Sequence, residues 1–358
     1  MIKRILLIVS VMTGILLYLL FSDSGTAKSE GSNIEKAERK AAASIETKKK
    51  EQDITIKISF AGDCTIGTDE KGIPYKDSFP YVLKQNKNDY DYFFKKVKPV
   101  FEKDDLTIVN LEGTFTTATK MARKKWRFKG DPSYVNIVKS GSIEMVNISN
   151  NHIYDFLTQG YNDTLKALKS KGILYSGEGH TEYYKTKNTT IASIGFNGWD
   201  TTIKKRLGNS IKTAKKKADI IIVSLHWGKE YTNYPNAVQT ELGRYSIDSG
   251  ADIVVGHHPH VIQGIEYYKG KYIVYSLGNF CFGGNPTPPD KDCIIFQNTF
   301  TFKEKKMSKS EGEILPCSVS TSDSINNFQP VVLEGEEGKR VLDRIYTYSK
   351  KLHYGIKK

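Results

Sequence analysis

Short apolar runs that alternate with helical segments constrain the fold of this chain most strongly. Residues 219–225 and 253–255 are rich in Ile and Val and have the length of buried strands. Helical patterns follow such runs, for example over 160–171 and 238–248. Strands joined by helical crossovers form mainly parallel sheets that are covered on both faces. The sequence therefore predicts an α/β fold with one mainly parallel sheet.

The same reasoning places the remaining elements. Further strands are expected at 54–60, 106–109, 145–148, 190–195 and 271–277. Further helices are expected at 92–101, 132–140, 204–217 and 337–352, and an edge hairpin at 294–302 and 314–318.

Polar side chains that bind metals follow the apolar runs. The segment 252–260 ends a buried strand with three histidines, and neutral imidazole is the commonest metal ligand among side chains. Ligands of such sheets bind outside the carboxyl ends of the strands. Taken singly, each residue is equally well explained as a cap or a turn, but together they favour one shared site. The residues at strand ends are Asp63, Asn110, Glu112, Asn151, His152, His226, His258 and His260.

These candidates define the chemistry of the expected site. Oxygen and imidazole ligands together suit Mn, Fe or Zn, so we expect one or two divalent ions. Such ions support hydrolysis by lowering the pKa of bound water. Asp155 and Glu230 are placed to orient a ligating histidine from behind, with a helix cap or a surface carboxylate as the alternative.

A basic segment and the overall charge indicate the kind of partner. Residues 114–131 carry Arg123, Lys125 and Arg127 among six cations, interleaved with Trp126 and Phe128. The segment is either an anion-binding rim or a solvated loop. The formal charge of +13 suits an acidic polymer or an anionic membrane surface, with simple solubility as the alternative. The chain has no zinc-finger spacing and no stacking platform, so we expect no nucleic acid partner.

The N-terminal region predicts export and anchoring. Lys3 and Arg4 precede an uncharged run at 5–21, which is the lower limit for a single membrane-spanning helix. The positive flank stays in the cytoplasm, so the main domain is expected outside the membrane. Residues 1–27 are thus a membrane anchor, or a signal segment cleaved near Ala27. Residues 28–53 are too polar to fold and form a disordered tether, which leaves one domain at 54–358.

The four cysteines show no metal-ligand spacing. An exported location permits disulfides, and a bond from Cys281 to Cys293 or Cys317 is possible. Four cysteines allow three full pairings, and the sequence does not choose among them.

Six motifs in a fixed order resemble the CapA/PgsA family of capsule, or poly-γ-glutamate, synthesis proteins. The resemblance covers residues 54–350 and implies a membrane-anchored, extracytoplasmic protein. It also implies poly-γ-glutamate as the acidic polymer and membrane-embedded capsule synthesis proteins as partners. The motifs are Gly62-Asp63, Asn110-Leu-Glu-Gly113, Asn150-Asn-His-x-x-Asp155, His226-Trp-Gly-x-Glu-Tyr231, Gly256-x-His-Pro-His-Val261 and Tyr275-Ser-Leu-Gly-Asn-Phe280.

That family is in turn similar to the calcineurin-like metallophosphoesterases, which implies a layered β-sandwich flanked by helices. The similarity makes His152 a catalytic contact to the phosphate or leaving group. Asp155 and Glu230, which could orient a ligating histidine, complete the catalytic candidates. The metal ligands that it implies are Asp63, Glu112, Asn151, His226, His258 and His260. Substrate contacts are expected from Asn110, Arg123, Lys125, Arg127, Trp227 and Asn279.

Two positions depart from the phosphoesterase pattern. Thr65 stands where the first motif has a histidine, and Glu112 is one methylene longer than the usual bridging Asp. His257 falls at an open position and is left outside the ligand set. A one-metal centre or a binding-only site is therefore an alternative to two metals.

Three functions fit these expectations. The first is a capsule-polymer assembly or export factor with a metal site. The second is a metal-dependent phosphoesterase that acts on a cell-envelope substrate, and the third is a non-enzymatic scaffold of an export complex. The fold alone does not choose among them.

Overall fold

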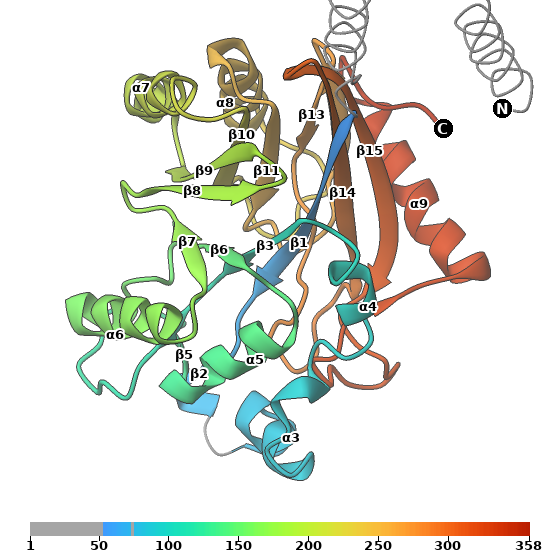
Figure 1. Ribbon diagram of the computed structural model, residues 1–358. Coiled ribbons are helices and arrows are strands. Elements are labelled where there is room, and N and C mark those ends of the chain that lie inside the picture. The colour runs from blue at the N-terminus through green and yellow to red at the C-terminus, as the bar shows by residue number, and fades with distance from the viewer. Residues whose placement is uncertain (1–52, 73–74) are drawn as a thin grey trace, which may run out of the picture. The chain divides into compact units, whose positions relative to one another are not determined.

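The computed structural model describes residues 53–72 and 75–358 (Figure 1). The predicted anchor at 1–27 and nearly all of the predicted tether at 28–53 lie outside these residues. None of the helices in the described part of the chain combines the length and the apolar character needed to span a bilayer.

Two sheets form the centre of the domain. The first sheet has the strand order β16-β15-β14-β1-β3-β6-β7, and the second has the order β12-β13-β11-β10-β9-β8. The first contains β1 (Ile54–Cys64), β3 (Leu106–Leu111), β6 (Met145–Asn147), β7 (Leu174–Ser176), β14 (Asp292–Lys303), β15 (Lys306–Ser318) and β16 (Val331–Val332). The second contains β8 (Thr181–Thr186), β9 (Thr189–Gly198), β10 (Ile220–Trp227), β11 (Ile253–His257), β12 (Ile265–Tyr268) and β13 (Lys271–Val274).

The core shows that the two sheets pack face to face. Ile58 and Ile108 of the first sheet share one apolar cluster with Ile222 and Val255 of the second. The next residue along β10, Val223, points to the opposite side and joins a different cluster. This alternation is the ordinary two-residue period of a strand. The observed sandwich agrees with the architecture that the family resemblance implies.

The prediction of a single, mainly parallel sheet is wrong in the number of sheets. Strands β1, β3, β6 and β7 are parallel neighbours, and so are β9, β10, β11 and β13. Antiparallel strands complete both sheets, including β14 beside β1 and β8 beside β9. A strand buried on both faces has the same apolar sequence whether helices or a second sheet cover it. The sequence pattern therefore does not distinguish the two arrangements.

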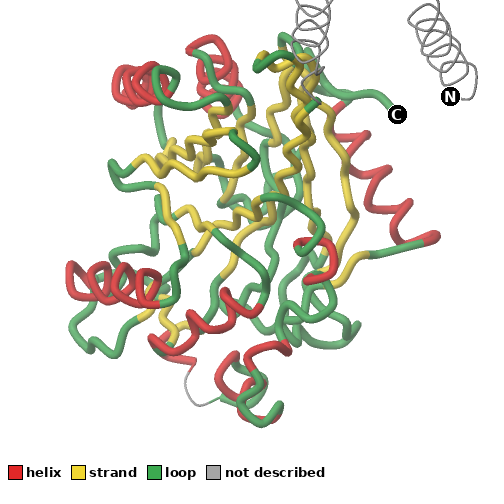
Figure 2. Tube along the Cα trace, in the orientation of Figure 1, coloured by secondary structure: helices red, strands yellow, loops and turns green. Residues whose placement is uncertain are grey.

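Helices cover the outer faces of both sheets (Figures 1 and 2). Four helices pack on the first sheet: α3 (Phe79–Gln85), α4 (Lys98–Phe101), α5 (Val135–Ser140) and α6 (Leu157–Ser170). Helices α7 (Lys204–Ala214) and α8 (Ala237–Ser249) pack on the second, and α9 (Gly335–Ser349) contacts β15 and β12. A small sheet of β2 (Thr68–Asp69), β5 (Phe128–Gly130) and β4 (Thr114–Phe115) lies beside them.

Three local predictions need correction. The helix expected at 92–101 is only a 3-10 turn at Tyr90–Tyr92 followed by α4, because Pro99 fits the start of a helix but not its interior. The edge hairpin is much longer than expected, since β15 continues through polar residues on an exposed edge. No disulfide links the four cysteines, which are all free and buried, although Cys293 lies opposite Cys317 in the hairpin.

Candidate metal centre

The carboxyl ends of strands from both sheets meet at one place. The backbone N–H of Asp63, in β1, donates to the carbonyl of Gly278 at 3.0 Å, and Phe280 N–H donates to the Asp63 carbonyl at 2.8 Å. A Cβ on Gly62 would lie 1.9 Å from the Gly278 oxygen, so only glycine permits this approach. Polar side chains of β3, β10 and the loop after β11 point to the same place.

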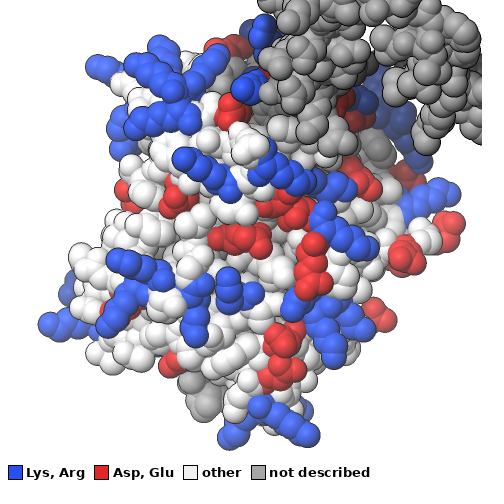
Figure 3. Space-filling model, in the orientation of Figure 1, with Lys and Arg blue, Asp and Glu red and all other residues white. Residues whose placement is uncertain are grey.

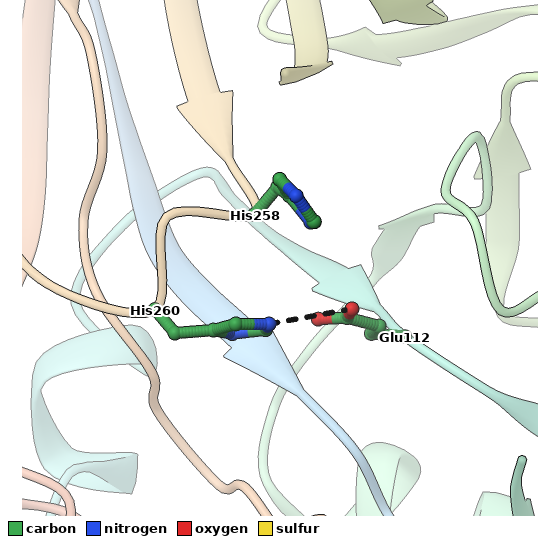
Figure 4. A group of neighbouring side chains, drawn as sticks. All are labelled: Glu112, His258 and His260. Carbon is green, nitrogen blue, oxygen red and sulfur yellow. Dashed lines mark ion pairs between the residues drawn. The ribbon is translucent and has the colours of Figure 1, made fainter. Parts of the chain in front are cut away.

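Glu112 lies at the centre of this group. Both of its carboxylate oxygens are buried and have no hydrogen-bond partner. Its Oε1 is 3.8 Å from the Nε2 atoms of three histidines, His152, His226 and His260. The ligand atoms of Glu112, His258 and His260 lie within 4.8 Å of one another, as the close view shows (Figure 4). A buried carboxylate without donors is costly unless a cation compensates it.

Asp63 is the second buried carboxylate of the site. It accepts hydrogen bonds from Asn110 Nδ2 at 2.8 Å and from the backbone N–H of His258 at 3.1 Å. His260 Nδ1 lies 3.3 Å from Asp63 Oδ2. Burial alone would raise the pKa of Asp63, but His260 holds that pKa below its ordinary value. Asp63 is therefore ionised and negative.

The charges of Glu112 and His260 depend on each other. Burial raises the pKa of Glu112 well above its ordinary value, against the opposing effect of His260. Burial would lower the pKa of His260, but Glu112 and Asp63 raise it to about 9. A cation bound among these residues would therefore take the place of the His260 proton as the positive charge beside the two acidic groups.

Two other histidines are held as neutral imidazoles. Burial lowers the pKa of His258 to about 3 and that of His226 well below its ordinary value. His258 Nδ1 is buried without a partner, and His226 Nε2 lies 2.7 Å from Asn151 Oδ1. Residues His258 and His260 have φ angles of +94° and +56°, on either side of Pro259. A neutral imidazole is the form that binds a metal.

His152 is oriented from behind by Asp155. The His152 Nδ1 atom lies 2.6 Å from Asp155 Oδ2, and Lys124 Nζ donates to Asp155 Oδ1 at 2.6 Å. The Phe128 ring stacks on the imidazole at a centroid distance of 4.2 Å. These contacts direct Nε2 of His152 towards Glu112. Among the described residues, Glu230 is exposed and makes no hydrogen bond to a histidine, so it lacks the supporting role that we expected.

The expected substrate contacts divide into two groups. Asn110 and Asn279 belong to the site, where Asn279 Oδ1 lies 2.8 Å from His260 Nδ1. Trp227 does not: it is fully buried in the outer core of the second sheet, and its Nε1–H donates to the Tyr275 carbonyl. The exposed tryptophan beside the imidazoles is Trp199, which the sequence interpretation missed although it directly follows a strand end. Its ring lies 4.8 Å from that of His258.

The predicted basic rim is also corrected. Arg123 and Lys125 are exposed, and Lys125 Nζ lies over the neighbouring Trp126 ring at 5.0 Å. Arg127 pairs with Glu70 and donates to two carbonyls of its own loop, so it holds that loop together. From this segment, Lys124 is the cation that reaches the site.

Thr65, which stands where the first phosphoesterase motif has a histidine, has a structural role. The Thr65 hydroxyl donates to the backbone carbonyl of Glu112 at 2.9 Å and so supports the loop instead of offering a ligand. His257, which the sequence interpretation left out, is buried with its Nδ1 atom 3.6 Å from Asp63 Oδ1 and without a hydrogen-bond partner. The His257 imidazole could therefore offer one further nitrogen ligand beside Asp63.

These donors fit a divalent metal. The site offers two carboxylates and several imidazoles, of which Glu112 and His258 have unsatisfied buried atoms. Mixed oxygen and nitrogen donors of this kind match Mn, Fe or Zn. The arrangement defines a buried group that could hold such an ion.

Comparison with known families identifies the class of this chain. The family described as "Bacterial capsule synthesis protein PGA_cap" matches residues 57–284, and the chain belongs to this family. The "PGA biosynthesis protein CapA" of Bacillus subtilis is 34% identical over 292 residues, which cover 75% of this chain and 72% of that protein. The "Capsule biosynthesis protein CapA" of Bacillus anthracis is 32% identical over 226 residues, or 55% of either chain. The resemblance stated from the motifs is confirmed.

Solved structures give a weaker likeness. A putative 5′-nucleotidase from Staphylococcus aureus aligns with a TM-score of 0.45 and 15% identity over 83% of this chain and 59% of its own. A 5′-nucleotidase from Candida albicans aligns with a TM-score of 0.42 and 14% identity over 82% and 58%. Likeness at this level does not define an activity.

Proposed function

We propose that this chain binds and hydrolytically processes an acidic capsule polymer, poly-γ-glutamate, during its synthesis or export. The observation that carries the proposal is the buried, unpartnered Glu112 carboxylate among imidazoles from both sheets. The names of the two Bacillus relatives supply the biological setting. The net charge of +13 suits a polyanion, and Lys and Arg side chains are spread over the face shown in Figure 3.

The residues of the site have separable tasks in such a reaction. Asp63, Glu112, His226, His258 and His260 would hold the ion, with Asn151 beside His226. A bound divalent cation supplies an activated water and neutralises an oxyanion.

The proton for the leaving group would come from His152. Burial lowers the pKa of His152, and its Nδ1–H is held by Asp155, so its Nε2 could take a proton from the attacking water and pass it to the amine as the γ-amide C–N bond breaks. Lys124 donates to the other oxygen of Asp155 and holds that carboxylate in place.

The setting outside the membrane is part of the same proposal. The uncharged run at 5–21 would anchor the chain in a single pass, and membrane-embedded synthesis proteins would be its neighbours. Protease treatment of intact protoplasts tests it. Digestion of the domain without lysis is expected, and full protection would contradict the extracytoplasmic placement.

Metal content and polymer cleavage test the central claim. Full-length protein is purified from metal-replete medium, and bound Mn, Fe and Zn are measured by mass spectrometry for wild type and Glu112→Gln. We expect metal in wild type, little in the variant, and shortening of poly-γ-glutamate only by metal-loaded wild type. Glu336→Gln, at a carboxylate whose side chain is 92% exposed, is the matched control. Metal-free wild type would contradict the proposal.

A phosphoesterase is the second candidate function. The close Asn151–His226 contact and the adjacent His152 form the arrangement that the phosphoesterase resemblance implies. Turnover of a phosphodiester that disappears in His226→Ala, together with intact poly-γ-glutamate, would favour this candidate. Absence of both activities from wild type would favour the scaffold alternative.

A further inference from the structure

A polar pocket adjoins the candidate metal centre and takes no part in holding the ion. Its volume is about 440 Å³. Besides two glycines, it is lined by Ser149, Glu178, Phe196, Asn197, Arg206 and Ser210.

Two strand connections place the pocket next to the imidazoles. Asn197 of β9 is in register with His226 of β10, so the two side chains lie on the same face of the sheet, about 4.8 Å apart between strands. Ser149 precedes Asn151 by two residues, and Asn151 Oδ1 lies 2.7 Å from His226 Nε2. The wall that Asn197 and Ser149 form therefore lies beside the residues proposed to hold the ion.

Glu178 forms the acidic wall of the pocket. Its Oε1 accepts hydrogen bonds from Ser149 Oγ at 3.2 Å and from Asn197 Nδ2 at 3.5 Å. Its backbone N–H in turn donates to Ser149 Oγ at 2.8 Å. These are neutral donors, and no cation pairs with Glu178 among the described residues. The carboxylate is thus fixed in position by neutral groups, without a cationic partner in the described part of the chain.

Arg206 forms the basic wall. The guanidinium group lies over the Phe196 ring at 5.8 Å, and Ser210 follows one helical turn later on α7. Within the described chain, Arg206 has no carboxylate partner, although Glu178 lines the same pocket. Opposite charges that face one cavity without pairing leave room for a ligand that carries both charges.

Asn197 adds an unsatisfied hydrogen-bond acceptor to the pocket. Asn197 Oδ1 is buried and has no hydrogen-bond partner. Buried acceptors are normally satisfied, so a bound donor would complete this wall.

We propose that this pocket binds the amino-terminal end of a γ-linked glutamate chain, with the α-carboxylate at Arg206 and the α-ammonium at Glu178. The inference rests on the proposed function and names its substrate end. In a γ-linked chain every residue keeps its α-carboxylate, but only the first also keeps a free α-ammonium, because the nitrogen of each later residue is acylated by the γ-carboxyl of the residue before it. That side chain then leads from the pocket towards His226. A phosphate group fits less well, since Glu178 repels a doubly charged anion.

Calorimetric titration with small probes tests the assignment on the full-length protein. The probes are γ-glutamyl-glutamate, α-glutamyl-glutamate and N-acetyl-γ-glutamyl-glutamate, with a chelator present so that no turnover consumes them. The α-linked probe lacks the free first α-carboxylate, and the acetylated probe lacks the ammonium. We expect the γ-linked dipeptide to bind. Each of the other two probes should bind at least about tenfold more weakly, because each loses one charged hydrogen bond.

Matched variants locate the binding. Arg206→Gln and Glu178→Gln are expected to weaken γ-glutamyl-glutamate binding about tenfold each. The controls, Lys205→Gln on the same helix and Glu336→Gln, should leave it unchanged. Equal binding of the three probes, no binding to wild type, or binding unaffected in both pocket variants would overturn the pocket assignment. Metal content and polymer shortening are measured in parallel, so failure of the proposed function is recognised separately.

Discussion

Two fully buried glutamates behave in opposite ways in this molecule. Glu266 accepts two hydrogen bonds from Arg244, one from the Tyr275 hydroxyl and one from the backbone N–H of Tyr354. Glu112 is equally buried but accepts none. The first carboxylate joins β12, α8 and the residue after β13 in a satisfied network, whereas the second is surrounded by imidazoles at 3.8 Å. Burial alone therefore does not tell a structural carboxylate from a ligand, but the presence or absence of donors does.

The largest expected effect concerns the satisfied carboxylate. Glu266→Ala should lower the free energy of unfolding by about 3 kcal/mol, the lower end for a broken buried pair, because Arg244 is partly exposed to water. Urea titration followed by circular dichroism measures it. Glu241→Ala, which breaks an exposed pair with Lys204, is the control and should cost less than about 1 kcal/mol. An effect of Glu266→Ala no larger than this control would remove the contrast.

The second prediction concerns the unsatisfied carboxylate. A metal at one hundred times its dissociation constant should stabilise wild type by about 2.7 kcal/mol over the chelated protein. Glu112→Gln should lose this gain and, with chelator, differ from wild type by less than about 1 kcal/mol, since no hydrogen bond is broken. Thermal unfolding with and without Mn or Zn checks both values. If metal stabilises the variant as much as wild type, Glu112 is not a ligand.

Asp155 tests the comparison further. Its carboxylate is buried and hydrogen-bonded, like that of Glu266, but it belongs to the candidate metal centre, like that of Glu112. Asp155→Asn should reduce metal-dependent turnover about 10- to 100-fold, as expected when the group behind a functional histidine is lost. Bound metal should change little, since Asp155 contacts His152 and not Glu112. The exposed Glu336→Gln serves as control, with a change of no more than about twofold. Equal losses in both variants would contradict the positioning role of Asp155.

The smallest effect comes from a half-buried carboxylate between the two extremes. Burial, together with nearby Glu144 and Asp105, raises the pKa of Asp104 to about 6 despite a hydrogen bond from Thr107. The folded state therefore favours the protonated acid, and this stability is present below pH 4 and lost between pH 4 and pH 6. Asp104→Asn should be more stable than wild type at pH 8 by about 1 kcal/mol and should lose that advantage near pH 4. An advantage independent of pH would refute this assignment.

Much of the centre could be predicted from the sequence, because strand ends mark it. Asp63, Glu112, His226 and His258 each follow an apolar run, and parallel strands bring such ends together. The sequence pattern did not indicate that these ends come from two sheets. Both arrangements bury strands on both faces and therefore select the same residues.

Side-chain direction explains most of the errors. Trp227 follows His226 directly, and successive residues of a strand point to opposite faces, so the pair cannot share the site. Strict use of this alternation would have excluded Trp227. No such rule exists for the loop that carries Lys124 and Arg127. Which of its cations reaches Asp155 depends on the tertiary contact of that loop with Glu70 and Phe128.

The four interior thiols give the molecule a built-in reporter of its own opening. Each is enclosed by apolar side chains, and Cys293 and Cys317 face each other across the longest hairpin. A maleimide or a disulfide reagent can reach them only when the strands part. The rate of labelling therefore measures how often the strands on that side of the sandwich separate, without any engineered probe.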